Sequence, residues 1–221
     1  MFGKKKFFIE PVESGEEVLI QISAPQKISK KTKLTVPQHY KAIAYIDQKA
    51  TFRVEPCIAK EVLNVYGKEY KGKYLQIAFI TSRSLTQSAW GFGNIQVNNE
   101  ALKEAYRIGA NGTFSIDITD YEKLISMFPN ENIITTEMIR EKCISTLKTV
   151  GVPIIGEYFA KTTTSVFEMS TLVADFRDKF LKALTEEKIF GIMGVKINVL
   201  TVNGFYANED DLEIIRNRIN A

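Results

Sequence analysis

One segment of the chain has the residue spacing of a phosphate-binding loop. Gly67, Gly72 and Lys73 form the pattern G-x4-G-K, in which backbone amides and a lysine surround the phosphates of a nucleotide. The next position holds Tyr74 instead of the serine or threonine that would bind magnesium. The residues after it predict a strand, not the helix whose N-terminus would face the phosphates. The pattern therefore favours an exposed turn, and a hydrolase or nucleotide-binding enzyme built on Gly67–Lys73 is kept only as an alternative.

Few other residues have the types and spacing of a catalytic or metal site. The chain contains one histidine, His39, which argues against centres built on several imidazoles. Cys57 and His39 would act as nucleophile and base only if the fold brought them together, and nothing in the local sequence does so. Cys143 lies on an apolar helical stripe, which favours a buried thiol. The acidic residues between 117 and 122 do not have the spacing of a calcium loop. We predict no catalytic residue, no metal site and no cofactor.

Positive charge is concentrated in the first half of the chain. Residues 1–110 contain 17 Lys/Arg and 10 Asp/Glu, whereas residues 111–221 contain 12 and 16. Three consecutive lysines near the N-terminus have phenylalanines on both sides, which suits an anionic headgroup region, where each basic residue contributes about 1 kcal/mol. The candidate membrane-contact residues are Phe2, Lys4, Lys5, Lys6, Phe7 and Phe8. A second basic cluster contains Lys27, Lys30, Lys31 and Lys33. The alternative is a solvated tail, and no nucleic-acid partner is expected.

The composition predicts a globular protein in a reducing compartment. The 221 residues are 45% hydrophobic and 25% charged, which is enough apolar material for a sizeable core. Two cysteines are too few for a disulfide framework. No apolar run reaches the roughly 20 residues that cross a bilayer, and the N-terminus does not have the pattern of a signal peptide. We therefore expect a cytoplasmic protein, attached at most peripherally to the inner face of a membrane.

The first half of the sequence predicts strands. The clearest is Tyr106–Ile118, where apolar and polar residues alternate strictly, as they do in a strand with one buried face. The other expected strands are Val18–Ser23, Lys33–Val36, Tyr40–Asp47, Thr51–Glu55, Tyr74–Thr81 and Gly91–Val97.

The second half predicts helices and one returning strand. Helices are expected from Asp120 to Phe128, from Thr135 to Val150, over Ile154–Ala160, over Glu168–Glu187 and over Asn208–Asn220. Asn208 is expected to cap the last of these, with acidic residues in the first turn. Gly151 and Pro153 are expected to interrupt the second of these, and the strand is Val195–Val202. Strands followed by helices indicate an α+β fold, with a twisted, mostly antiparallel sheet in the first half.

Four segments together resemble a known family. They are Lys33–Val36 with Ala42–Ile46; Phe79–Thr81 with Trp90-Gly91; Tyr106–Ile116 leading into Asp120-Tyr121 and Leu124; and the helix ending near Lys188 with the strand Val195–Val202 and the acidic stretch Asn208–Asp211. In order and spacing they resemble the SPFH superfamily (stomatin, prohibitin and flotillin, also called band 7). Within it they are most similar to the bacterial subgroup labelled virion core protein-like.

The resemblance implies a domain organisation and a function. It implies a basic N-terminal tail over residues 1–16, an SPFH-like domain over 17–206 that is strand-rich to about 118 and helical over 119–206, and a C-terminal helix over 207–221. Such domains perform no catalysis, form homo-oligomers at membranes and organise lipids or partner proteins. We therefore expect a scaffold or adaptor that meets a membrane surface or a membrane protein. The alternative is a soluble protein-interaction module with no lipid contact.

Overall fold

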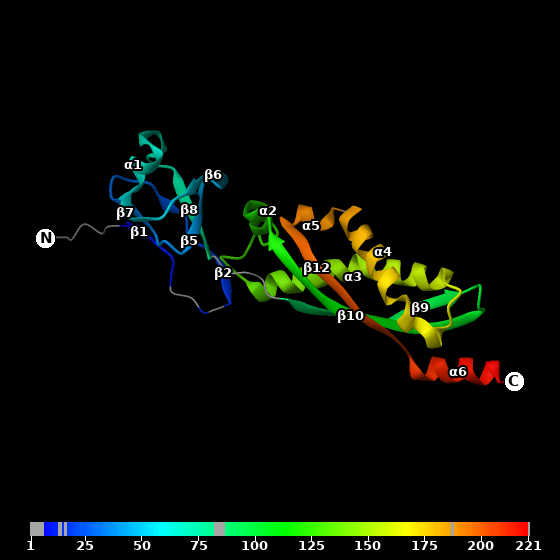
Figure 1. The fold of residues 1–221 in the computed structure, drawn as a ribbon. Helices are drawn as coiled ribbons and strands as arrows, with labels where there is room; N and C mark the ends of the chain where they lie inside the picture. Colours follow the sequence, from blue (N-terminus) through cyan, green and yellow to red (C-terminus); the bar gives the residue numbers. More distant parts are fainter. Residues whose placement is uncertain (1–6, 13–14, 16, 82–86, 187, 221) are drawn as a thin grey trace. The chain divides into compact units, whose positions relative to one another are not determined.

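The structure is a computed structural model that describes residues 7–12, 15, 17–81, 87–186 and 188–220. It contains both helices and twisted antiparallel sheets, so the predicted α+β class is confirmed. The chain divides into two compact units, each described separately below (Figure 1). Unit 1 comprises residues 1–84 and 125–139, and unit 2 comprises residues 85–124 and 140–221. The domain boundaries expected at residues 16, 118 and 206 stay predictions.

Unit 1 contains two sheets that share one core. The larger sheet has the order β11-β2-β8-β5-β6, with β3 also paired to β8. Its strands are β2 (Val18–Ile22), β3 (Gln26–Lys27), β5 (Tyr40–Ile46), β6 (Lys49–Val54), β8 (Tyr74–Thr81) and β11 (Ile133–Thr135). The smaller sheet has the order β1-β4-β7, formed by Phe7–Ile9, Thr32–Val36 and Cys57–Glu61. Buried residues of both sheets, among them Leu34 and Ile77, belong to one hydrophobic cluster.

Unit 2 is built on a three-stranded antiparallel sheet. The order is β12-β10-β9, and the strands are β9 (Ser88–Asn99), β10 (Glu104–Ile118) and β12 (Val195–Ala207). Across both units, the helices that the structure describes are α1 (Val62–Tyr66), η1 (Lys68–Tyr70), α2 (Tyr121–Ser126), α3 (Thr136–Lys161), η2 (Val166–Leu172), α4 (Val173–Glu186), α5 (Ile189–Ile192) and α6 (Glu209–Ile219).

Helices α3 and α4 pack aromatic side chains on one face of the unit 2 sheet. Phe159 of α3 lies 4.8 Å, centroid to centroid, from Phe205 of β12. Phe180 of α4 lies 5.8 Å from Trp90 of β9, and Phe176 lies 5.2 Å from Phe205. All of these except Phe205 are buried. The alternation predicted for β10 is confirmed, because its apolar side chains point into this core and its polar ones away from it.

Helix α3 is continuous, so the interruption expected at Gly151 and Pro153 is wrong. The structure keeps Pro153 inside the helix. The missing N–H of a proline removes one helical hydrogen bond, but Ile155 and Phe159 beyond it are fully buried, and their burial outweighs that loss. Gly151 is a packing position, since a Cβ there would lie 2.9 Å from the ring of Phe180.

Several short elements were not expected from the sequence. They are β1, β3, β7, α1, η1, β11 and α5. Strand β1 lies in the segment expected to be a basic tail and pairs with β4 in parallel. Strand β12 continues five residues beyond the expected end at Val202, to Ala207. The expected cap of α6 is confirmed, because the Asn208 side chain accepts a hydrogen bond from Asp211 N.

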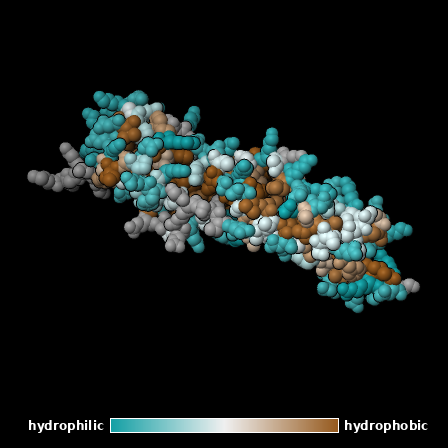
Figure 2. Space-filling model, viewed as in Figure 1, coloured by the Kyte–Doolittle hydropathy of each residue, from teal (hydrophilic) through white to brown (hydrophobic). Residues whose placement is uncertain are grey.

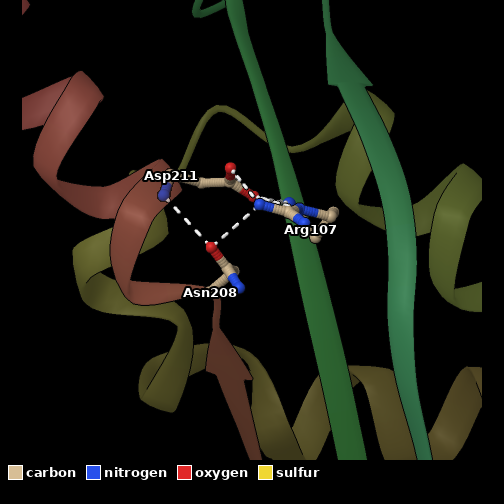
Figure 3. A network of polar contacts seen from close by, with 3 residues as sticks. All are labelled: Arg107, Asn208 and Asp211. Carbon is tan, nitrogen blue, oxygen red and sulfur yellow. Dashed lines mark hydrogen bonds and ion pairs between the residues drawn. The ribbon is translucent and has the colours of Figure 1, made fainter.

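An arginine of β10 holds the first turn of α6. Arg107 donates from its backbone N and from Nε to Asp211 Oδ2, at 2.8 and 2.9 Å. Its Nη2 donates to Asp211 Oδ1 and to Asn208 Oδ1, at 2.9 and 3.0 Å (Figure 3). The paired geometry of a guanidinium and a carboxylate fixes orientation as well as charge. These bonds from Arg107 lower the pKa of Asp211.

Replacing Asp211 with asparagine is expected to lower the stability of unit 2 at neutral pH but not at acidic pH. The folded-state pKa of Asp211 lies below its unfolded-state value, so the carboxylate stabilises the fold above the unfolded pKa of about 3.9. That contribution is lost as the pH falls through the folded-state pKa. Urea denaturation followed by circular dichroism should show the two midpoints converging below about pH 4. Asp210→Asn is the control, and an equal gap for Asp211→Asn at every pH would contradict the prediction.

Candidate functional site

The outer face of the small β1-β4-β7 sheet exposes apolar and basic side chains. Parallel pairing places Phe8 of β1 beside Lys33 of β4, and the next pair, Ile9 and Leu34, is buried. Since side chains alternate along a strand, Phe8 and Lys33 point outward. The Phe8 side chain is 48% exposed. A phenylalanine ring therefore lies at the surface next to a lysine.

Ile58 of β7 is the most exposed large apolar residue among those that the structure describes, at 84%. Its neighbour Cys57 points into the core, where Sγ contacts the carbonyl oxygen of Leu34 at 3.6 Å. Ala59 has a φ of 46°, which is strained for a residue with a Cβ, and its N–H donates to Thr35 Oγ1 at 3.1 Å. The irregular pairing between β4 and β7 at this point turns Ile58 outward.

Lysines of the second basic cluster lie at the end of this sheet where β1 and β4 begin. Lys30 and Lys31 form the turn before β4, and both are exposed. Ser29 fixes that turn, because its Oγ accepts from Lys31 N at 3.2 Å and its carbonyl accepts from Thr32 N at 3.1 Å. Parallel strands begin at the same edge, and Phe7 pairs with Thr32.

These five residues form one surface, called here the basic-apolar surface: Phe8, Lys30, Lys31, Lys33 and Ile58. Glu61 of β7 lies opposite Lys33 and offsets one of the positive charges. The charge of unit 1 as a whole is positive, with 15 Lys/Arg and 10 Asp/Glu, whereas unit 2 has 14 and 16. Hydrophilic residues cover most of the visible surface around α1 and β7, with separate hydrophobic residues among them (Figure 2).

The membrane-contact residues predicted from the sequence are only partly within the structure. Phe2, Lys4, Lys5 and Lys6 lie outside the described residues. Phe7 and Phe8 begin β1, and Phe8 belongs to the basic-apolar surface. Sequence reasoning identified the lysine cluster as a feature of charge but did not place it beside Phe8, and it missed Ile58.

A small cleft adjoins the basic-apolar surface in unit 1. It has a volume of about 260 Å³, and Phe8, Val12, Ile22 and Phe79 are among the residues that line it. The buried side chain of Gln21 holds its rim, since Gln21 Oε1 accepts from Val12 N at 3.0 Å and Nε2 donates to Val12 O at 2.8 Å. The lining is partly apolar, and it continues the apolar character of Phe8.

The residues considered for catalysis are dispersed. His39 is exposed and packs against Tyr40 at 4.5 Å between ring centroids, whereas Cys57 is buried. Burial raises the pKa of the Cys143 thiol to about 12, and the thiol form of cysteine is a poor nucleophile. The strand expected after the Gly67 loop is confirmed as β8, which begins at Tyr74.

Two other kinds of site are absent from the part of the chain that the structure describes. Among the described residues, no group of three or more His, Cys, Asp or Glu side chains could hold a metal ion. In the same part of the chain, no helix has both the length and the apolar character needed to cross a bilayer.

Comparison of the chain with known proteins returned no family whose model matches it. The same holds for curated proteins, none of which matches the chain at a significant level.

Proposed function

We propose that the protein is a non-enzymatic scaffold or adaptor of the SPFH type, without a cofactor, that attaches peripherally to a membrane. It acts by self-association or by recruiting a partner protein. Two observations support the proposal: the resemblance of the four sequence segments, and the basic-apolar surface of unit 1. The second carries the membrane part, because its residues come from three strands and one turn that are brought together only by the fold.

The chemistry of the basic-apolar surface suits the interface of an anionic membrane. Phe8 and Ile58 are 48% and 84% exposed, and moving their apolar side chains out of water lowers the free energy. Lysines beside them gain from the negative potential of anionic lipids, by about 1 kcal/mol each. A surface with both properties binds more strongly than one with either alone, because the two contributions add.

Removing the turn lysines is expected to weaken binding to anionic vesicles. Loss of two charges, in Lys30→Gln with Lys31→Gln, should raise the apparent dissociation constant about 30-fold. Ile58→Ser should raise it about tenfold, because an apolar side chain no longer inserts. Both changes are at exposed positions, so the thermal midpoint should not change. Co-sedimentation with phosphatidylcholine vesicles, with and without phosphatidylserine, measures the effect.

A matched control keeps the test specific to the surface. Lys142→Gln with Lys148→Gln removes the same charge from exposed positions of α3 in unit 2 and should leave binding close to that of the wild type. Added salt should weaken wild-type binding, since screening acts on exposed charges. Equal effects of the two pairs of substitutions, or no binding of the wild type to either vesicle, would remove the membrane part of the proposal.

One observation favours the alternative of an interaction module that contacts no lipid. Helix α6 is held at its first turn by Arg107 and buries Ile215, yet it exposes Ile214 and Ile219 at 57% and 65%. A helix fixed in this way could present both side chains to a partner protein. This alternative would be favoured if the wild-type protein did not bind lipid vesicles but did bind membranes that contain proteins.

A further inference from the structure

The unit 2 sheet has a second face, which α3 and α4 do not cover and which lacks charged side chains over its central part. The face, called here the open face, is formed by Ala89, Gly91, Gly93, Gly109, Asn111, Thr113, Ser115, Val199, Thr201, Asn203 and Tyr206. Charges occur only at its two ends. Arg107 at one end is bonded to Asp211, and Asp117 at the other pairs across the ladder with Lys196.

Tyr206 lies flat on the open face, supported by two glycines. A Cβ at Gly109 would overlap the Tyr206 ring, and one at Gly93 would lie 3.3 Å from its hydroxyl. The hydroxyl donates to the carbonyl oxygen of Phe92 at 3.1 Å. The ring is nevertheless 49% exposed. A fixed, half-exposed tyrosine is the kind of residue that contributes most binding energy at protein interfaces.

Hydrogen bonds also fix the polar side chains of the open face. The hydroxyls of Thr113 and Thr201 are 2.8 Å apart, and Gln87 Nε2 donates to Thr113 Oγ1 at 2.5 Å. Thr201 Oγ1 donates in turn to Asn203 Oδ1 at 3.1 Å. Side chains that are already held lose little conformational entropy when a partner binds. Val199, 45% exposed and next to Thr201 along the face, adds an apolar contact.

We propose that the open face is where a second copy of this chain docks, face to face about a twofold axis. In a twofold contact each residue patch meets itself or its own neighbours, so a face with net charge would repel its copy. The open face avoids this repulsion because its centre is neutral and Arg107 at one end is already paired with Asp211. Its amides and hydroxyls include both donors and acceptors, which makes the face complementary to itself.

The size of the open face fits a dimer of moderate affinity. From Arg107 to Asp117, strand β10 covers ten residue steps, which is about 33 Å, and three strands span about 15 Å. The flat area is therefore about 500 Å². Because side chains project from the sheet, the accessible area that a partner would bury is larger and approaches the roughly 600–1,000 Å² per partner of specific interfaces. Gly91, which is exposed and is not covered by the Tyr206 ring, leaves space for a side chain of the second copy.

The test measures the mass of the full chain in solution at increasing concentration. This inference rests on the proposed function only in its self-association part. Sedimentation velocity should show a monomer–dimer equilibrium with a dissociation constant on the order of micromolar. Asn111→Lys puts like charges at the centre of the contact and should weaken the dimer at least about tenfold. Ser145→Lys, at an exposed position of α3, adds the same charge and should leave the dimer unchanged.

Two further measurements decide what a negative result means. The thermal midpoint of Asn111→Lys should equal that of the wild type, because the side chain is exposed, and Val199→Lys provides a second variant. A monomeric wild type, or a larger assembly that Asn111→Lys does not alter, would overturn the inference. Vesicle binding is measured separately on the same proteins. A dimer that binds no vesicle overturns only the membrane proposal, and a monomer that binds vesicles overturns only the proposed dimer.

Discussion

Replacing Phe180 with alanine should lower the free energy of unfolding of unit 2 by about 3–5 kcal/mol. Phe180 is fully buried on α4, where it contacts Trp90 and Phe176 at 5.8 and 5.5 Å between ring centroids. Gly151 of α3 lies against the Phe180 ring, since a Cβ there would be 2.9 Å from it. Because these neighbours belong to a sheet and a second helix, they cannot collapse fully into the space, so a cavity remains and adds to the loss of apolar burial.

The adjacent residue provides the control for Phe180. Leu181, the next residue of α4, is 41% exposed, and Leu181→Ala should cost less than about 1 kcal/mol. Urea denaturation followed by tryptophan fluorescence measures both, because Trp90 is the only tryptophan and lies in unit 2. The emission of Phe180→Ala should also shift to longer wavelength in the folded protein, as the indole loses an apolar neighbour. Similar losses for the two variants would contradict the placement of Phe180 in the core.

The long periodic elements could be predicted from the sequence. The alternation in β10 and the apolar stripe of α3 that contains Cys143 arise from residues that bury one face, and burial is the dominant stabilising contribution. Their orientation was therefore predicted together with their existence. The cap of α6 was also predictable, because an asparagine followed by acidic residues satisfies the free amides of a first turn.

The elements that were missed depend on distant contacts. Strands β1 and β7 are three and five residues long, and they exist because β4 lies between them to accept their hydrogen bonds. The continuity of α3 through Pro153 depends on the burial of the residues beyond it. No local pattern carries this information, because both results come from packing partners elsewhere in the chain.

The same distinction holds for the candidate surfaces. Phe8 was predicted as a contact residue because it lies beside a lysine run. The position of Lys33 beside Phe8 could not be predicted, since it comes from the parallel pairing of β1 with β4. The exposure of Ile58 could not be predicted either, since it comes from the irregular ladder between β4 and β7. For the open face, the period of β10 predicted an outward-facing row. Tyr206 was missed because the strand was expected to end at Val202.

Three glycines of the unit 2 sheet should respond very differently to substitution by alanine. At Gly91 a Cβ would meet its nearest neighbours at 3.8 Å or more, so Gly91→Ala should raise stability by about 0.5 kcal/mol through reduced freedom of the unfolded chain. At Gly109 a Cβ would overlap the Tyr206 ring, and at Gly112 it would overlap the carbonyl oxygen of Thr201. Gly109→Ala should cost about 1 kcal/mol and Gly112→Ala about 3 kcal/mol.

The difference between Gly109 and Gly112 follows from what each Cβ would displace. A tyrosine ring at the surface can rotate away at the loss of one hydrogen bond, whereas the backbone of β12 is held by its ladder to β10. A double-mutant cycle measures this directly by urea denaturation. In a Tyr206→Ala background, Gly109→Ala should lose most of its cost, and Gly112→Ala should keep all of its cost. If the cost of Gly109→Ala were the same in both backgrounds, Tyr206 would not lie on Gly109, and the fixed aromatic ring on which the open face depends would be absent.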